Sequence, residues 1–370
     1  MRVAMLGLRA PREGLGGVEG VVKALAPLLT RRGVDLTVLC RSRYLEGPSP
    51  PGIHEVGFPS LPGSGVETLS YALLAMLATR PFDVVHIHSH GSSALSVLPH
   101  LRHQVVVVSF HGLDWSRPKW GGGARTFLRL SEEVALRYAD RVVVVSPELE
   151  QIYRGRARGG VELIPNGVEP QPTIGPGPLQ QLGLEPEGYV LFLGRLVPDK
   201  GCHVLLDTWR GMSHPLKLVM AGPGEENDPY VRDLHTRAAA DPRVIMAGPV
   251  TGDLKLSLLQ HAAAFVLPSR VEGLSLALLE AMMAGCCVIA SDIPANRGVL
   301  EGAGILVPEG DQRALTLALE KALGDRPAAR ILGELAHQRA VAHYSWDHAA
   351  DLHADLYRRL VACRGRGGVL

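Results

Sequence analysis

The sequence has few aromatic residues, few cysteines and no long hydrophobic run. Aromatic residues make up 5% of its 370 residues, and its five cysteines show no spacing typical of metal ligands or of a disulfide framework. No apolar run reaches the roughly 18 residues needed to span a bilayer. A strand pattern begins at Arg2, which leaves no room for a signal peptide. We therefore expect a cytoplasmic protein with reduced cysteines, in which any contact with the inner face of the plasma membrane is peripheral.

An excess of one charge is also lacking. The formal net charge is +1, which argues against a protein that binds nucleic acid. The composition, 46% hydrophobic and 20% charged, is that of a folded protein, and its 42 glycines and 27 prolines are spread along the chain, as expected for many turns. A chain of this length predicts two domains.

Short apolar runs alternate with helical patterns, and this alternation starts twice. Such a series predicts parallel sheets built from strand–helix–strand units. The first series of strands is expected at residues 3–6, 36–39, 84–87, 105–109 and 142–145, and the second at 189–193, 216–220, 244–247, 264–267, 288–290 and 305–307. The fold class is therefore α/β, with two Rossmann-like domains that face each other across an interdomain cleft.

The domain boundaries follow from the composition between the two series. Residues 169–187 are rich in proline and glycine and are expected to be a linker. This places the N-terminal domain at 1–168 and the C-terminal domain at 188–345. The remaining 346–370 contains an amphipathic helix, which either closes the second domain or crosses back to the first.

The strongest candidate site is a pair of glutamates eight residues apart. Glu272 is expected in a loop that follows an apolar strand, and Glu280 in the helix after it. Carboxylates accept hydrogen bonds from sugar hydroxyls, and backbone N–H groups at the start of a helix attract phosphate oxygens. The alternative is an ordinary amphipathic helix with solvated acids, but the helix is apolar nearly all round. The N–H groups in question belong to Gly273, Leu274 and Ser275.

A second candidate lies in the loop after the first strand of the second series. Arg195 comes directly after that strand, and Lys200 lies at the start of the next helix. Two cations at the carboxyl end of a parallel strand are suited to hold a diphosphate without a metal. Taken alone, they are more often solvated loop residues.

The first domain offers a glycine loop and a histidine at corresponding places. Gly16 and Gly17 precede a helix, where their N–H groups are open to an anion, but the loop lacks the G-x-G-x-x-G spacing of a dinucleotide site. His111 directly follows an apolar strand. His86, His88 and His90 superficially suggest a metal cluster, but no acids lie nearby in sequence, so we expect no metal and interpret them as a polar lining.

Together these residues resemble glycosyltransferase family 4, which has the GT-B fold and retains the anomeric configuration. The resemblance rests on residues 16–19, 164–168, 194–201, 221–224, 272–280 and 304–311 and on the segment around His111. It implies a transferase that uses a nucleotide-diphosphate sugar and no other cofactor. It also implies that the first domain binds the acceptor and the second the nucleotide sugar.

The resemblance assigns roles by position. Arg195 and Lys200 would hold the diphosphate, Glu272 the donor sugar and Glu280 the ribose, with Gly222 and Gly224 also at the donor. Gly16 and Gly17 would meet the phosphates when the domains close, and His111 would lie beside the reacting sugar. We place His111, Glu272, Arg195 and Lys200 in the catalytic set. The acceptor side is assigned Arg9, Glu19, His88, Trp115, Arg117 and Trp120.

The first half is also similar to bacterial rhamnosyltransferases of that family, through residues 6–9 and 112–120. The segment from Trp115 to Arg129 is basic and aromatic. It is suited either to rest on anionic lipid near a lipid-linked acceptor or to wrap on the protein itself as an acceptor-side loop.

The sequence thus predicts transfer of a hexose or deoxyhexose to a glycan, a lipid-linked glycan of the bacterial cell envelope, or a glycosylated small molecule. Two alternatives stay open. An NAD-dependent oxidoreductase would need the fingerprint that the first turn lacks. A non-catalytic protein that binds nucleotide sugars or polysaccharide would not need both the cation pair and the glutamate pair.

Overall fold

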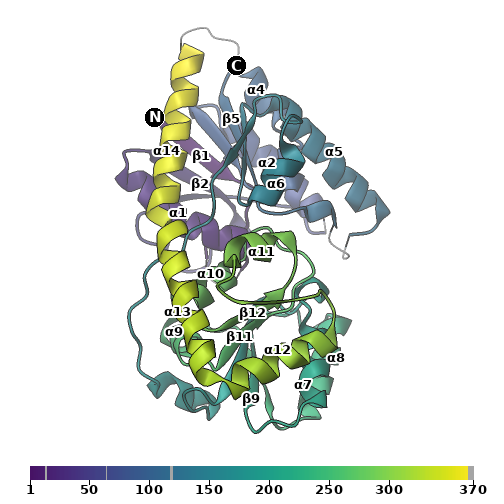
Figure 1. The fold of residues 1–370 in the computed structure, drawn as a ribbon. Helices are drawn as coiled ribbons and strands as arrows, with labels where there is room; N and C mark the ends of the chain where they lie inside the picture. Colours follow the sequence, from purple (N-terminus) through teal and green to yellow (C-terminus); the bar gives the residue numbers. More distant parts are fainter. Residues whose placement is uncertain (13–14, 64, 117–119, 366–370) are drawn as a thin grey trace. The chain divides into compact units, whose positions relative to one another are not determined.

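The computed structural model describes residues 1–12, 15–63, 65–116 and 120–365. The chain forms two compact units (Figure 1). Unit 1 consists of Met1–Asn166 together with the chain from Trp346 on, and unit 2 consists of Gly167–Ser345. Each unit is built around one sheet in which the strand pairs are parallel.

In the described part of unit 1, the sheet has seven strands in the order β3-β2-β1-β4-β5-β6-β7. Its central strands are buried on both faces because helices cover the sheet. The elements are β1 (Arg2–Leu6), α1 (Gly17–Arg31), β2 (Asp35–Arg41), η1 (Ser42–Tyr44), β3 (His54–Phe58), α2 (Val66–Ala78), β4 (Val84–Ile87), α3 (His90–Ser93), α4 (Val97–Leu101), β5 (Val105–Phe110), η2 (Asp114–Ser116), α5 (Gly122–Tyr138), β6 (Arg141–Val144), α6 (Pro147–Tyr153), β7 (Val161–Leu163) and α14 (Trp346–Gly365).

In the described part of unit 2, the sheet has six strands in the order β10-β9-β8-β11-β12-β13. Its core includes the fully buried Trp209, Phe192 and Leu206. The elements are η3 (Gly177–Leu182), β8 (Tyr189–Leu193), η4 (Pro198–Lys200), α7 (Cys202–Gly211), β9 (Lys217–Ala221), α8 (Pro229–Ala239), β10 (Val244–Gly248), α9 (Gly252–Gln260), β11 (Ala264–Leu267), α10 (Leu276–Met283), β12 (Val288–Ser291), α11 (Pro294–Leu300), β13 (Ile305–Val307), α12 (Gln312–Gly324) and α13 (Arg326–His343).

The α/β fold with two parallel sheets is the one predicted, and every strand expected from an apolar run is present. Two strands of the first sheet were not predicted. These are β3 and β7, at its two edges. Their side chains are half-buried or exposed, so neither strand has the apolar run that marks a strand covered on both faces.

The stretch expected to be a linker, residues 169–187, is part of unit 2. Its backbone is tied to α9: the N–H of Ile174 donates to Oε1 of Gln260 at 2.8 Å, and Nε2 of Gln260 donates to the carbonyl of Pro172 at 2.8 Å. Leu179, in η3, is fully buried. The residues expected to be a linker thus form an extended segment and a short helix that contact the rest of unit 2.

The last helix, α14, belongs to unit 1 and packs along α1 (Figure 1). Arg32 at the end of α1 pairs with Asp347 at 3.0 Å and with Asp351 at 2.6 Å. The hydroxyl of Tyr357 lies 2.6 Å from Nδ1 of His86 inside the unit. Of the two alternatives stated for this helix, the structure has the one in which it returns to the first unit.

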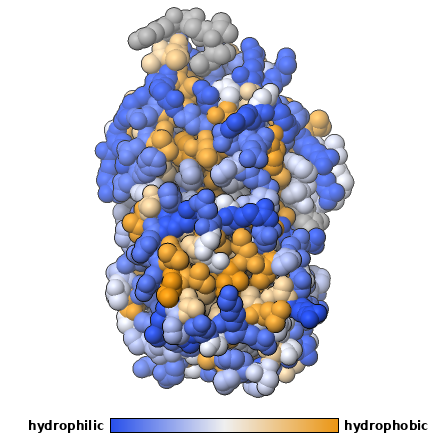
Figure 2. Space-filling model, in the orientation of Figure 1, coloured by the Kyte–Doolittle hydropathy of each residue, from blue (hydrophilic) through white to orange (hydrophobic). Residues whose placement is uncertain are grey.

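Apolar side chains also reach the surface, as Figure 2 shows for one face of the molecule. Large exposed ones include Leu73 and Leu77 on α2 and Ile331 and Leu335 on α13. Exposed apolar residues of this kind are common on folded proteins. Among the helices described, none combines the length and the apolar composition needed to cross a membrane.

Candidate active site

In unit 2 the strand order reverses between β8 and β11, so the loops that leave the carboxyl ends of these strands are neighbours. Open parallel sheets bind ligands at such a point. Nζ of Lys200, at the end of η4, lies 2.5 Å from Oε1 of Glu272 in the loop after β11. The two side chains are 16% and 8% exposed. The structure therefore brings these two predicted residues into direct contact.

A glycine allows the Lys200 loop to approach the loop after β11. Gly201 has a φ of 67°, and a Cβ on it would lie 2.1 Å from the carbonyl oxygen of Pro268. The N–H of Arg270 donates to the carbonyl of Asp199 at 2.8 Å, which ties the same two loops together. Backbone contact thus fixes the position from which Lys200 reaches Glu272.

Replacing Gly201 by alanine is expected to damage this arrangement. The new Cβ cannot fit against the Pro268 backbone, and alanine is disfavoured at positive φ. We expect the affinity for a nucleoside diphosphate to fall about 10-fold or more, with a lower melting temperature. Calorimetry measures the affinity, and thermal unfolding measures the melting temperature. Gly211→Ala is the matched control, because Gly211 ends the same helix α7 with open space around it, and normal binding by G201A would contradict the argument.

The loop after β9 is held by a second close approach. A Cβ on Gly222, whose φ is 138°, would lie 2.0 Å from the carbonyl oxygen of Gly194, directly before Arg195. Gly224 is a packing position, since a Cβ there would meet the side chain of Val231 at 3.0 Å. These two glycines set the backbone around Arg195.

Helix α10 carries the second glutamate. Ser275 caps the helix, with its hydroxyl accepting from the N–H of Leu278 at 3.4 Å. Glu280 lies on the second turn, and its Oε1 is 2.7 Å from Nζ of Lys255 on α9. Leu274 and Ser275 are each 7% exposed, so the start of the helix is mostly buried and Gly273 leads into it. The sequence did not single out Lys255, because its partner lies on another helix.

In unit 1 the glycine loop is held by an ion pair. Nε of Arg9 lies 3.0 Å from Oε1 of the buried Glu19, and the guanidinium also donates to the carbonyl of Leu15. Gly16 precedes α1, and a Cβ there would lie 2.5 Å from Oε2 of Glu19. Gly17 is the first residue of α1 and has open space around it. Arg9 and Glu19, predicted for the acceptor side, therefore shape this loop.

The histidines of unit 1 form a buried group at the carboxyl ends of β4 and β5. Nδ1 of His88 lies 3.2 Å from Nε2 of His111, and the two rings stack. Nε2 of His86 lies 2.7 Å from the hydroxyl of Ser109. His353 of α14 lies beside His86, with ring centroids 5.6 Å apart. In the described ranges, no group of three or more His, Cys, Asp or Glu is arranged to hold a metal ion.

Burial keeps these imidazoles neutral. It lowers the pKa of His111 to about 4, with neighbouring charges acting in both directions. It also lowers the pKa of His353 to about 4 and those of His86 and His88 well below the ordinary value of a histidine. His111 is therefore uncharged at neutral pH. Its side chain can donate or accept a hydrogen bond, but it does not supply a positive charge.

The basic-aromatic segment folds onto the protein where the structure describes it. Nε1 of Trp115 donates to Oε2 of Glu132 at 2.8 Å, and the guanidinium of Arg129 lies over the indole at 4.5 Å. Trp120 is half-buried, and Arg117 lies outside the described residues. The sequence analysis did not single out Glu132. A glutamate among the apolar residues on the buried face of α5 could have indicated it, because acids are rarely buried without partners.

Comparisons with known proteins identify the family of this chain. Residues 15–172 match the family model described as Glycosyltransferase Family 4, and residues 187–325 match the one described as Glycosyl transferases group 1. The chain is 28% identical to alpha-maltose-1-phosphate synthase of Mycobacterium tuberculosis, over 98% of this chain and all of that protein.

Solved structures show the same fold. Sucrose-phosphate synthase from Thermosynechococcus elongatus superposes with a TM-score of 0.86 at 24% identity, covering 98% of this chain and 100% of that one. HepE of Anabaena, solved with UDP and glucose, gives 0.81 at 18% identity, covering 97% and 100%. The two family matches together span most of the sequence, so the chain belongs to glycosyltransferase family 4 and is a glycosyltransferase with the GT-B fold.

Proposed function

We propose that this enzyme transfers a hexose or deoxyhexose from a nucleotide-diphosphate sugar, with retention of anomeric configuration and without a metal. The donor binds in unit 2. The contact between Lys200 and Glu272, at the switch point of a parallel sheet, carries this proposal. The acceptor is a glycan, a lipid-linked glycan of the bacterial cell envelope or a glycosylated small molecule, used in the cytoplasm or at the inner face of the plasma membrane.

The site contains the charges that a diphosphate leaving group needs. Lys200 and Arg195 supply two cations on one loop, and the start of α10 adds backbone N–H groups. As the bond between the sugar and the phosphate breaks, negative charge grows on the diphosphate, and these groups stabilise it. These groups supply the positive charge that a metal ion supplies in other sites. We therefore propose that no metal is required.

The two glutamates orient the rest of the donor. Glu272, beside Lys200, accepts hydrogen bonds from the hydroxyls of the sugar, and Glu280, held by Lys255, accepts those of the ribose. We assign His111 to the reacting sugar. We assign no side chain as a covalent nucleophile. The acceptor hydroxyl therefore attacks from the face that the diphosphate leaves, and a diphosphate oxygen takes its proton.

Retention and metal independence can be tested in one assay. We expect the glycosidic product to have the same anomeric configuration as the donor, as read by NMR coupling constants. The rate should be unchanged in excess EDTA, since the cations are side chains. UDP-glucose is the first donor to test, because UDP and glucose are bound in the structure of HepE. An inverted product would contradict the same-face attack, and loss of activity in EDTA would contradict metal independence.

The non-catalytic alternative has a simple discriminating measurement. A transferase that binds its donor as proposed should hydrolyse it slowly to nucleoside diphosphate and free sugar when no acceptor is present. A binding protein should leave the donor intact. Thermal shift with a series of nucleoside diphosphates identifies the base, because a ligand at saturating concentration raises the free energy of unfolding by kilocalories per mole. Including NAD in the same series tests the oxidoreductase alternative.

A further inference from the structure

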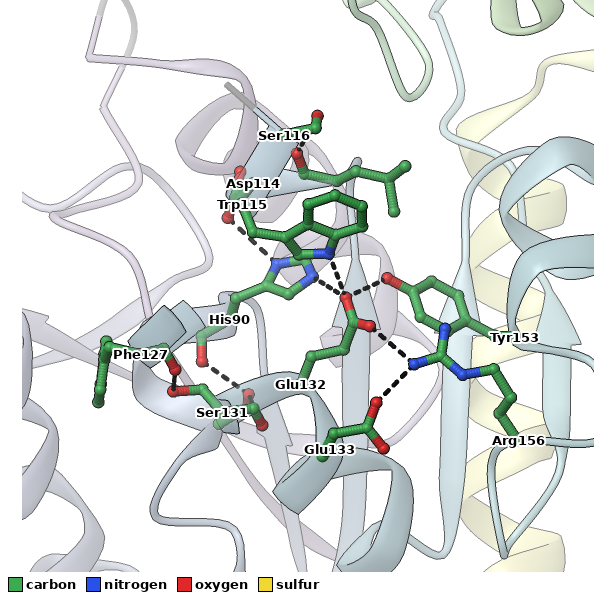
Figure 3. A network of polar contacts seen from close by, with 12 residues as sticks. His90, Asp114, Trp115, Ser116, Phe127, Ser131, Glu132, Glu133, Tyr153 and Arg156 are labelled. Carbon is green, nitrogen blue, oxygen red and sulfur yellow. Dashed lines mark hydrogen bonds and ion pairs between the residues drawn. The ribbon is translucent and has the colours of Figure 1, made fainter. Parts of the chain in front are cut away.

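A cluster of charged side chains lies buried beneath the segment that follows β5 (Figure 3). His90, the first residue of α3, lies between two carboxylates. Its Nδ1 is 3.2 Å from Oδ2 of Asp114, and its Nε2 is 3.4 Å from Oε2 of Glu132. The His90 and Glu132 side chains are 2% and 4% exposed. Neither the sequence motifs nor the donor site accounts for this cluster.

Glu132 is the centre of the cluster. Its carboxylate accepts hydrogen bonds from Nε1 of Trp115 at 2.8 Å, from the hydroxyl of Tyr153 at 2.7 Å and from Nη2 of Arg156 at 3.1 Å (Figure 3). Burial favours its neutral form, but the contact with His90 and the hydrogen bonds from Tyr153 and Trp115 lower its pKa to about 2. Glu132 is therefore a carboxylate at any physiological pH.

His90 is a cation in this setting. Burial opposes its charge, but the hydrogen bonds and charges of Asp114 and Glu132 outweigh burial and raise its pKa to about 9. The same side chain stacks on Phe110 at 4.2 Å between ring centroids, so it has little freedom to turn. Buried ion pairs of this kind stabilise a fold weakly compared with apolar packing, and where they are kept they often fix one arrangement.

The cluster links the loop after β4 to the loop after β5, as does the contact between His88 and His111. The loop after β4 carries His88 and His90, and the loop after β5 carries His111 and Asp114. His88 contacts His111 as a neutral pair, whereas His90 contacts Asp114 as an ion pair. Removing the ion pair would take away the contact that holds Asp114 to the loop after β4.

We propose that His90 is a positioning residue for the acceptor: its cation fixes Asp114 directly and Trp115 through Glu132, and these two present a carboxylate and an aromatic ring to a sugar acceptor. This rests on the proposed function, because the acceptor is a substrate of that reaction. Sugars are recognised by hydrogen bonds that their hydroxyls donate to carboxylates and by the apolar face of an indole. His90 itself does not touch the acceptor.

The decisive variant is His90→Asn, which keeps a polar side chain and removes the cation. We expect sugar transfer to an acceptor to fall on the order of 100-fold, as misplacement of a substrate by about 1 Å does. Donor hydrolysis without acceptor and nucleoside diphosphate affinity should stay within about twofold. Because a merely structural role would lower all three together, the split between transfer and hydrolysis identifies positioning.

Two further variants sharpen the test. Glu133→Gln is the matched control, because Glu133 bonds the same Arg156 but its side chain is 63% exposed, and it should leave transfer unchanged. Asp114→Asn combined with His90→Asn removes both charges. The double variant should be less impaired than the two single changes added together predict, because both side chains act through the same contact.

A spectroscopic readout follows Trp115 directly. Its indole N–H is bonded to Glu132, so its exchange with solvent should be slow in the native protein and at least 10-fold faster in H90N. The indole resonance is assigned by its disappearance in Trp115→Phe. Unchanged indole exchange together with unchanged transfer in H90N would overturn the proposal.

A measurement on the unaltered protein covers the case in which H90N does not fold. The groups that face His90 are Asp114 from η2 and Glu132 from α5, with Tyr153 and Arg156 bonded to Glu132 in turn. The ratio of transfer to donor hydrolysis should be constant from pH 7 to 8 and fall as the pH rises through about 9, where His90 loses its proton. A ratio that stays constant to pH 10 would overturn the proposal.

If the native protein neither binds nor hydrolyses any nucleotide sugar, the proposed function is wrong instead.

Discussion

Replacing Lys200 by methionine is expected to weaken binding of a nucleoside diphosphate about 100-fold or more, equivalent to about 3 kcal/mol. Methionine keeps most of the side-chain volume and removes the ammonium that lies 2.5 Å from Glu272. The Glu272 carboxylate, 8% exposed, would then face the phosphates without a counter-charge and repel them. Isothermal calorimetry with the diphosphate identified by thermal shift gives the affinity, and donor hydrolysis should fall in parallel.

A second lysine of the same sheet is the control for this experiment. Lys217 begins β9, and its Nζ donates to the carbonyl of Gly183 at 2.7 Å at the surface, at the amino end of the strands. Lys217→Met should bind the diphosphate normally. If K200M kept its affinity as well, Lys200 would be a structural partner of Glu272, and the diphosphate would have to be held by other groups.

Mild acid is expected to unfold unit 1. Four histidines have folded-state pKa values below the value of about 6.5 in an unfolded chain: the buried His86, His88 and His353, and the half-buried His111. The unfolded state therefore takes up protons first as the pH falls below 6.5, and the free energy of unfolding decreases until about pH 4. His111 and His353, each with a folded-state pKa of about 4, contribute a loss of roughly 2 kcal/mol each between pH 7 and 5, and His86 and His88 act in the same direction.

Thermal unfolding between pH 7 and 5 measures this effect. His353→Leu, on α14, should unfold with a weaker dependence on pH, whereas replacement of the exposed His54 or His235 should leave the dependence unchanged. His90 acts in the opposite direction, since its raised pKa gives stability that is complete below 6.5 and is lost as the pH rises through 9. An acid profile of H353L that matched the native one would show that these imidazoles are not the cause.

The strands could be predicted because each depends on residues close in sequence, and the donor residues that we propose were chosen on the same basis. Apolar runs of four or five residues mark strands covered on both faces, and the two glutamates and the loop of Arg195 follow such runs directly. The edge strands β3 and β7 lack that signal because polar residues and a glycine interrupt their short apolar sequences. Residues 169–187 were taken for a linker because proline and glycine indicate turns, and their hydrogen bonds to Gln260 are made 86 and 88 residues away.

The partners of the charged side chains were not predictable. Lys200 meets Glu272 across 72 residues, and His90 meets Asp114 and Glu132 only because α3, η2 and α5 come together. A histidine between two acids and a histidine among other histidines look alike in a sequence. The structure separates them: one is charged at neutral pH and the others are neutral.

The path of the chain has a consequence for synthesis. Unit 1 is made of two pieces, and α14 follows the whole of unit 2 in the chain. During translation, residues 1–166 emerge first without Tyr357 and His353, so His86 has no partner from α14 until about 180 further residues have been added. Domains fold as they emerge, the N-terminal one usually first. Here unit 2 is the first that can be completed on the ribosome, and unit 1 stays unfinished until α14 arrives.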